Sequence, residues 1–270
     1  MLDLGIARIE HETMRQRVHA ALRERLMSGA FEPGQGLKIA ELALACGTSA
    51  MPVREALSRL VAERALESLP NRSVRVPTLS ASQLRDLRDV RRAIEGLATE
   101  MATSRMSRDD LDALAGLLEA QRAADGANRI EDSVQKNWRF HFTIYARSGS
   151  EALLPIIEGL WLRFGPYLRR AAALFDGRKG EATEFHALTL AALARGDVAG
   201  ARRGIEADIG RSFDLLLETG DDQDKRLSSE ARPREAMGGS GSREDRKTTR
   251  TMKAERRFHR SGVGSRRAAR

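Results

Sequence analysis

The sequence predicts a mainly α-helical fold, in which an N-terminal winged helix-turn-helix is followed by an all-α helical bundle. Helix-favouring Ala, Leu, Arg and Glu recur throughout the 270 residues, whereas aromatic residues make up only 4%. Apolar residues return every three or four positions along most of the chain, and beyond residue 79 no segment alternates convincingly between apolar and polar residues. A chain of this length is comfortable for two domains.

The composition argues against several classes of protein. Hydrophobic residues make up 41%, enough to bury a core, yet uninterrupted apolar runs are a handful of residues long, far short of the roughly 20 that span a bilayer. The first residues lack the apolar core of a signal peptide. The single cysteine, Cys46, cannot form an intrachain disulfide. We therefore expect a cytoplasmic protein with no membrane partner.

The basic charge is concentrated towards the C-terminus. The whole chain carries a net charge of +8, but residues 221–270 account for +7, residues 79–220 for −1 and residues 1–78 for +2. The last fifty residues are rich in Arg, Ser and Gly without apolar periodicity, so they cannot bury enough surface to offset the entropy of ordering. We expect a disordered tail there, which either attracts DNA without sequence preference or is dispensable.

The first folded segment is a helix from about Glu12 to Ser28. Its apolar residues are four positions apart, which places them on one helix face. They are Val18, Leu22 and Leu26. Gly29 ends this helix, and Pro33-Gly34 marks a turn.

Two further short helices follow, joined by a tight turn at Gly47. The first is expected over Ile39 to Ala45, with Ala40, Ala43 and Leu44 facing inward. The second is expected from Met51 to Val61, and Pro52 in its first turn costs nothing because its missing N–H would be unpaired there. Its buried stripe consists of Val53, Leu57, Leu60 and Val61. Two helices joined in this way are typical of a helix-turn-helix.

Short extended segments come next and predict a hairpin, or wing. They run from Ala65 to Leu69 and from Ser73 to Val76, on either side of Pro70-Asn71-Arg72. Beyond the wing, helices are expected over residues 80–104, 107–126, 131–146, 151–162, 167–175, 180–194 and 197–217. Helices of this number and spacing in about 140 residues form a bundle.

The N-terminal segment resembles GntR-type regulators. The residues that carry the resemblance are Gly29, Phe31, Pro33-Gly34, Leu37, Glu41-Leu42-Ala43, Gly47, Ser49, Pro52 to Leu57, Arg59-Leu60, Pro70 to Ser73 and Val76. The resemblance implies that the helix from Met51 is the recognition helix of a DNA-binding domain. Relatives usually carry Arg where this chain has Ala50, so the operator sequence of relatives does not transfer.

The expected DNA contacts follow from the chemistry of the side chains around that helix. Thr48, Ser49 and the backbone N–H groups at its start suit phosphate oxygens, and Arg54 is suited to a bidentate contact with a guanine edge. Lys38 and Arg59 are expected to contact phosphates, and Arg72 is expected to contact a phosphate or the minor groove. Alternatively, Arg54 and Arg59 only solvate the helix and pair with Glu55 or Glu63.

The second segment resembles the ligand-binding FCD domain of FadR-type GntR regulators. The residues that carry this resemblance are Val90-Arg91 with Glu95, Asn137 to His141, Leu160-Trp161 with Gly165-Pro166, Phe185-His186, Gly196-Asp197, Ala201 and Ile209. The two resemblances and the composition of the tail together predict three parts of the chain. They are a winged helix-turn-helix over residues 1–78, an FCD-like effector-binding and dimerisation domain over residues 79–220, and the tail over residues 221–270.

Many relatives bind a divalent metal ion in this domain. Mapped onto this chain, the ligands are Asn137, His141, His186 and Asp208. The spacing is compatible, because Asn137 and His141 are one helical turn apart, and the other two lie at similar depth, about 14–18 Å from the turn between the last two helices. Two imidazoles with oxygen ligands suit Zn, Ni, Mn or Fe.

Two positions depart from the family pattern and leave the metal's identity open. Asn137 stands where many relatives have Asp, and Asp208 stands where many have a third His. An Asn and a His on an amphipathic helix can also be an ordinary satisfied polar pair. The usual effector of the family is a small carboxylate, which Arg91 would bind unless it pairs with Glu95 on the helix surface.

The resulting expectation is a ligand-responsive transcriptional regulator, a repressor rather than an enzyme. A homodimer would bind the two half-sites of a palindromic operator in double-stranded DNA. The alternative is a metal-dependent enzyme built on the four predicted ligands, but no motif supplies the base or nucleophile that it would need. A helical interaction scaffold would not explain the wing.

Overall fold

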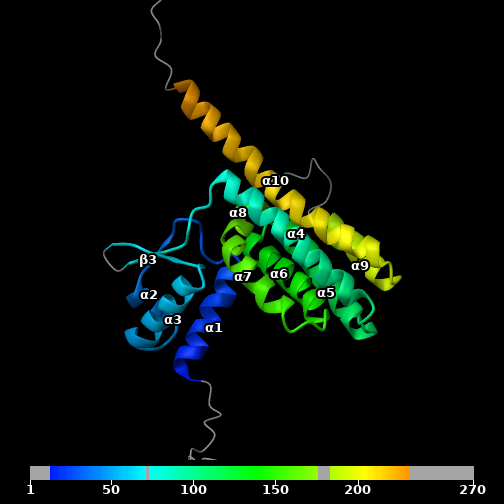
Figure 1. The fold of residues 1–270 in the computed structure, drawn as a ribbon, viewed down its shortest axis with the longest axis horizontal. Coiled ribbons are helices and arrows are strands. Elements are labelled where there is room, and N and C mark those ends of the chain that lie inside the picture. The colour runs from blue at the N-terminus through cyan, green and yellow to red at the C-terminus, as the bar shows by residue number, and fades with distance from the viewer. Residues whose placement is uncertain (1–12, 71–72, 176–182, 231–270) are drawn as a thin grey trace, which may run out of the picture. The chain divides into compact units, whose positions relative to one another are not determined.

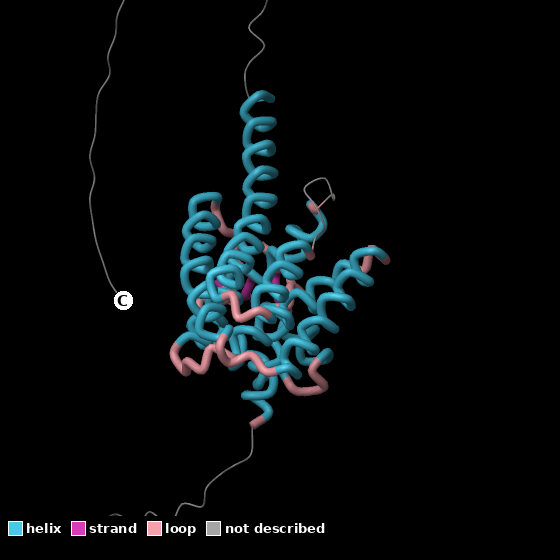
Figure 2. The backbone as a smooth tube through the Cα atoms, turned by 90° about the vertical axis from the view of Figure 1, so that its right-hand side faces the viewer, coloured by secondary structure: helices cyan, strands magenta, loops and turns pink. Residues whose placement is uncertain are grey.

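A computed structural model describes residues 13–70, 73–175 and 183–230, with side chains to residue 219. Helices make up most of the described chain (Figure 2). Within these residues, no helix is both long and apolar enough to cross a membrane. The helix-turn-helix and the bundle belong to one compact unit that extends to Ser229.

The N-terminal part is a winged helix-turn-helix (Figure 1). Its elements are α1 (Met14–Met27), β1 (Gly36–Leu37), α2 (Ile39–Ala45), α3 (Ala50–Ala62), β2 (Glu67–Ser68) and β3 (Val74–Arg75). The three strands form one antiparallel sheet with β3 in the centre. The hairpin of β2 and β3 confirms the predicted wing, whereas β1 was not expected. Asn71 and Arg72, which lie between β2 and β3 in the sequence, are outside the described residues.

The predicted inward face of α2 is wrong for two of its three residues. Ala43 is buried, but Ala40 is exposed and Leu44 is 85% exposed. The residues that pack inward are instead Ile39, Leu42, Ala43 and Cys46. Both sets fit one face of so short a helix. The observed face turns two large aliphatic side chains, Ile39 and Leu42, towards the core, whereas the predicted face offers only Leu44.

The remaining elements form the predicted bundle. They are α4 (Ala81–Thr103), α5 (Arg108–Gly126), α6 (Ile130–Ala146), α7 (Leu153–Phe164), the 3-10 helix η1 (Gly165–Tyr167), α8 (Leu168–Leu174), α9 (Glu184–Ala194) and α10 (Val198–Glu230). Ser80 and Ser107 start α4 and α5 with capping boxes, in which side chain and backbone satisfy each other's hydrogen bonds. The core of the bundle is rich in buried rings, namely Phe140, Tyr145, Trp161, Phe164 and Phe213.

The last helix is longer than the sequence predicted. It was expected to end near Leu217, with a disordered tail from residue 221, yet α10 continues to Glu230. The prediction rested on the loss of apolar periodicity, but a helix that already exists gains one backbone hydrogen bond with each added residue and needs no buried face to continue. The rest of the predicted tail, residues 231–270, lies outside the described residues.

The helix-turn-helix contacts the bundle through α1, which packs against α7 and η1. A Cβ atom at Gly165 would overlap the carbonyl oxygen of Leu26, so glycine allows this close approach of η1 to α1. Arg23 of α1 bonds Glu158 of α7 at 2.8 Å and also pairs with Glu63 at the end of α3. The winged helix-turn-helix is therefore attached to α7 and η1 by packing and by ion pairs.

Candidate DNA-binding surface and metal centre

The recognition helix α3 turns an apolar face to the core and a polar face to solvent. Val53, Ala56, Leu57 and Leu60 are buried. Arg54 and Arg59 are exposed, as predicted, and neither makes an ion pair with a described residue. The carboxylates that could have held them have other partners, since Glu55 pairs with Arg15 and Glu63 pairs with α1. The two arginines are therefore available to a polyanion.

The other predicted DNA contacts surround the start of α3. Ser49 is exposed and is the N-cap residue, but its side chain makes no capping hydrogen bond, while Thr48 is half-buried. Lys38 is exposed and bonds Glu41 at 2.7 Å, and this hydrogen bond raises the pKa of the Lys38 ammonium. Arg72 lies outside the described residues.

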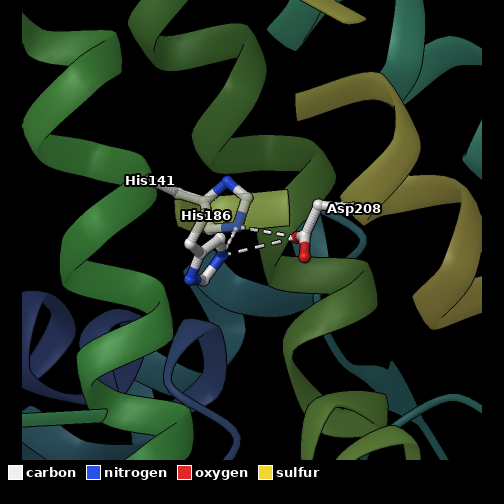
Figure 3. A group of neighbouring side chains, drawn as sticks. All are labelled: His141, His186 and Asp208. Carbon is white, nitrogen blue, oxygen red and sulfur yellow. Dashed lines mark hydrogen bonds and ion pairs between the residues drawn. The ribbon is translucent and has the colours of Figure 1, made fainter. Parts of the chain in front are cut away.

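Three of the four predicted metal ligands meet in the bundle (Figure 3). His141 comes from α6, His186 from α9 and Asp208 from α10, and all three are buried. Nε2 of His141 lies 3.1 Å from Oδ2 of Asp208 and 3.2 Å from Nε2 of His186. Nε2 of His186 lies 3.6 Å from the same carboxylate oxygen. One ligand atom from each residue therefore points to a common centre.

Neighbouring side chains fix which nitrogen of each imidazole faces that centre. The Tyr145 hydroxyl donates its proton to Glu95 over 2.6 Å, so it must accept the 2.8 Å hydrogen bond from Nδ1 of His141. The amide oxygen of Gln121 likewise accepts a 3.0 Å hydrogen bond from Nδ1 of His186. Each neutral ring then carries its proton on Nδ1 and a lone pair on Nε2.

This pattern of protonation makes the centre suitable for a cation. Two imidazole lone pairs and a carboxylate oxygen face one another at 3.1–3.6 Å, and no donor proton is left between them. The two lone pairs and the carboxylate oxygen therefore repel one another. A cation bound between them would be coordinated by all three atoms. Metal-binding histidines commonly donate their second nitrogen to an oxygen acceptor in this way, because the bond fixes ring orientation and tautomer.

The pKa shifts agree with a neutral His141 and a protonated Tyr145. Burial lowers the pKa of His141 and outweighs the opposing influence of Asp208. Burial and the neighbouring Glu95 raise the pKa of Tyr145 well above its usual value, which keeps its hydroxyl protonated.

A cavity of about 920 Å³ adjoins the cluster. Its lining includes Asp208 and also Asn137, the fourth predicted ligand, which lies one helical turn before His141 on α6. Gln121 and Arg211 also line it. Arg211 bonds Asp208 at 3.4 Å and lies over the ring of Phe185 at 4.4 Å. Of the three converging residues, Asp208 thus lines the cavity, together with Asn137 and the guanidinium group of Arg211.

Arg91 occupies a different environment from the one expected. It is 1% exposed, bonds Glu95 at 2.6 Å, and lies over the rings of Trp161 and Phe164 at 4.5 Å and 4.2 Å. It forms neither a surface pair nor part of the described lining of the cavity, so its contact with an effector stays a prediction. Arg211, which sequence reasoning missed, is the arginine beside the ligand set.

Comparisons with known proteins address both parts of the chain. Residues 14–76 match the family model described as "Bacterial regulatory proteins, gntR family", and residues 86–211 match the FCD domain. The HTH-type transcriptional regulator McbR of Escherichia coli K12 is 34% identical over 215 residues, which cover 79% of this chain and 97% of that protein.

The chain belongs to the GntR family.

Two further likenesses support the assignment of this GntR-family protein. The transcriptional repressor GlaR of Escherichia coli K12 is 30% identical over 182 residues, covering 64% of this chain and 83% of GlaR. The solved structure of Escherichia coli McbR superposes with a TM-score of 0.72 at 31% identity, covering 77% of this chain and 99% of that one. A GntR structure from Rhodococcus sp. RHA1, with a TM-score of 0.61 at 21% identity over 76% of this chain and 97% of its own, shares the fold.

The matches place the predicted residues in their domains. The GntR match contains every predicted DNA contact, and the FCD match contains Arg91 and all four predicted metal ligands. The relatives are transcriptional regulators and not enzymes, as the sequence led us to expect. The GntR-family chain is thus a DNA-binding regulator with an FCD domain.

Proposed function

We propose that this regulator is a repressor that binds a palindromic operator as a homodimer and releases it in response to a small carboxylate held beside a divalent metal ion. The observation that carries the proposal is the convergence of His141, His186 and Asp208, of which Asp208 also lines a cavity, in a chain that carries a GntR helix-turn-helix. One relative, GlaR, is itself named as a repressor.

The residues present fit a divalent cation. Two neutral imidazole nitrogens and a carboxylate converge, and Asn137 can add an amide oxygen from the cavity wall. This donor set suits Zn, Ni, Mn or Fe. The ion would supply positive charge and open coordination positions for an anionic ligand, while Tyr145 and Gln121 hold the two imidazoles in orientation.

Arg211 gives the cavity a group that can bind a carboxylate effector. Arg211 lies beside Asp208, and a guanidinium group matches the planar geometry of a carboxylate. The effector would thus lie between the ion and Arg211. Its identity beyond this chemical class requires screening, for which small metal-chelating carboxylates are the first set.

Contacts at the end of α1 offer a route from the cavity to the DNA-binding domain. A Cβ atom at Gly29 would lie 3.1 Å from Val134 and 3.4 Å from Leu168, and both of these residues line the cavity. An effector that displaces Leu168 therefore acts directly on the end of α1. It changes DNA affinity only if it binds the DNA-bound and free arrangements with different affinity.

A homodimer follows from the two half-sites of a palindrome. An apolar stripe on α4 is the candidate contact surface. Val90 and Leu97 are 40% and 39% exposed, and Ile94 and Met101, which share their face by spacing, are half-buried. Sedimentation of the full chain at micromolar concentration, with and without DNA, tests for a dimer.

The metal is tested by elemental analysis of the purified full chain beside the triple variant Asn137→Ala/His141→Ala/His186→Ala. About one metal ion per chain in the wild type, lost in the triple variant, is the expected result. The variant His19→Gln is a matched control, because His19 is also buried but bonds Glu63 in the helix-turn-helix. It should keep the metal.

The response to metal is then read as operator affinity with added ion and with a chelator. If the wild type binds no metal even after reconstitution, the metal part of the proposal fails. Binding of a selected DNA duplex would in that case still support the DNA-binding part, and the effector would have to be held by Arg211 and the polar side chains of the cavity.

A further inference from the structure

The first turn of the recognition helix is apolar on its exposed side. α3 begins at Ala50, and both Ala50 and Met51 are exposed. Met51 is 59% exposed, whereas the apolar residues that hold α3 in place are at most 1% exposed. Exposure of a large apolar side chain at this position is not explained by packing within the chain.

The helical geometry places Met51 on the same face as Arg54. At about 100° per residue, Met51, Arg54 and Ser58 fall within about 60° of one another around α3, whereas the buried Val53, Ala56 and Leu60 lie on the opposite side. The first three residues are all exposed. The face that carries Arg54 towards a base edge therefore also carries Met51 towards the groove.

The spacing along α3 sets how far apart the two contacts fall on DNA. Three residues of α-helix rise about 4.5 Å, and successive phosphates on one strand are about 3.4 Å apart along the duplex. Met51 would therefore reach a base pair one or two steps from the base that Arg54 contacts. The N-terminal end of a recognition helix is the end that approaches base edges in this class of motif.

The side chain of Met51 limits what it can read. A thioether donates no hydrogen bond and accepts only weakly, so it cannot distinguish the polar groups of base edges. The major groove presents one apolar group, the C5-methyl of thymine. Methionine is also flexible and polarizable, which lets it fit such a group closely.

We propose that Met51 reads the 5-methyl group of a thymine one or two base pairs from the guanine that Arg54 contacts. The inference rests on the proposed operator binding through α3 and adds a residue that determines sequence preference. Its ligand is a specific chemical group, so it can be tested by removing that group from the DNA.

The experiment first selects duplexes from a randomised DNA library with the full-length wild-type chain. The thymine nearest to the conserved guanine is then replaced by deoxyuridine, which lacks only the 5-methyl group. Removing one methyl from an apolar contact should weaken wild-type binding by about three- to five-fold. A duplex with 5-methylcytosine in place of that thymine should bind more tightly than a duplex with cytosine there.

The variant Met51→Ala distinguishes a contact of the methyl group with Met51 from an effect of the methyl group that does not involve this side chain. It should bind the thymine and deoxyuridine duplexes equally, and in its own selection the thymine preference should fall. Leu44→Ala is the matched control, because Leu44 is an exposed apolar residue of the same domain that lies on α2. It should keep the wild-type response to deoxyuridine.

The possible failures are distinguishable. If the wild type selects a defined sequence but tolerates deoxyuridine without loss, or if Met51→Ala shows the same loss as the wild type, the proposal for Met51 is overturned and operator binding stands. If the wild type selects no sequence at all, the proposed operator binding fails, and the inference fails with it.

Discussion

Replacing Tyr145 with Phe removes one buried oxygen atom that links the candidate metal centre to the core. The hydroxyl accepts a 2.8 Å hydrogen bond from His141 and donates a 2.6 Å hydrogen bond to Glu95. Glu95 keeps its bonds to Arg91 and Trp161 in the variant, whereas Nδ1 of His141 is left buried without an acceptor. An unsatisfied buried donor of this kind costs about 1–3 kcal/mol of folding free energy.

The same change should weaken metal binding. Without an acceptor at Nδ1, nothing holds the His141 proton away from Nε2, so the tautomer and ring orientation that present the lone pair are no longer fixed. Loss of such a supporting hydrogen bond typically lowers metal affinity by about 10–100-fold. The affinity is measured by competition with a chromophoric chelator, using zinc as the probe.

Stability is measured by urea unfolding of the metal-free protein, followed by tryptophan fluorescence. Trp138 and Trp161 are the only tryptophans of the chain, and both lie in the bundle, so the signal reports the domain that holds the site. Tyr167→Phe is the matched control, because its hydroxyl accepts a hydrogen bond from the backbone of Leu79 at 2.6 Å. It should lose stability without losing zinc affinity. Equal zinc affinities of Tyr145→Phe and Tyr167→Phe would refute the reasoning about the tautomer.

Three further perturbations test other parts of the structure. Arg54→Ala should weaken binding to the selected duplex by about 1–3 kcal/mol and relax the preference for guanine, as measured by fluorescence anisotropy, and an unchanged affinity would contradict its assigned contact. The side chain of Arg147, together with Ser107, lowers the pKa of Asp110 to about 2. The stabilisation by ionised Asp110 is therefore complete above its unfolded pKa of about 3.9 and disappears as the pH falls through about 2. Asp110→Asn should accordingly be less stable than the wild type near pH 7, and urea unfolding should show the difference shrinking below about pH 4; a difference independent of pH would argue against this cause. Gly165→Ala should destabilise the chain by about 1–3 kcal/mol because the added Cβ overlaps α1, whereas Gly159→Ala on α7, where a Cβ meets no atom within 4 Å, should not, and equal melting temperatures of the two variants would contradict the close packing.

The sequence predicted much of the fold because most helices are long enough to show a period. The start of α4 at Ser80 and of α5 at Ser107 could be read from capping residues, whose chemistry is local. The inward face of α2 could not, because seven residues fit two stripes equally well. The end of α10 was also missed, since apolar periodicity marks where a helix is buried and not where it stops.

The candidate metal centre shows a similar division. The meeting of His141, His186 and Asp208 followed from one family pattern and from helix geometry, which places residues at equal depth. The orienting partners were missed, although Tyr145 lies one turn after His141 on the same helix and could have been noticed. Gln121 is far from His186 in sequence, so only the packing of α5 against α9 shows that the two side chains meet.

The close contacts of two glycines at the domain boundary also bear on how such regulators can exchange parts. Gly165 lies against the end of α1 from one side, and Gly29, at φ +73°, lies against Leu168 from the other. A chimaera cut only in the connecting segment near Pro77 would bring together two surfaces that were never fitted to each other. A larger residue at Gly29 of the donor domain, or at Gly165 of the host bundle, would force the two domains apart. Exchange of DNA-binding domains between regulators of this shape, in the laboratory or over evolution, therefore requires that both glycine contacts be inherited together.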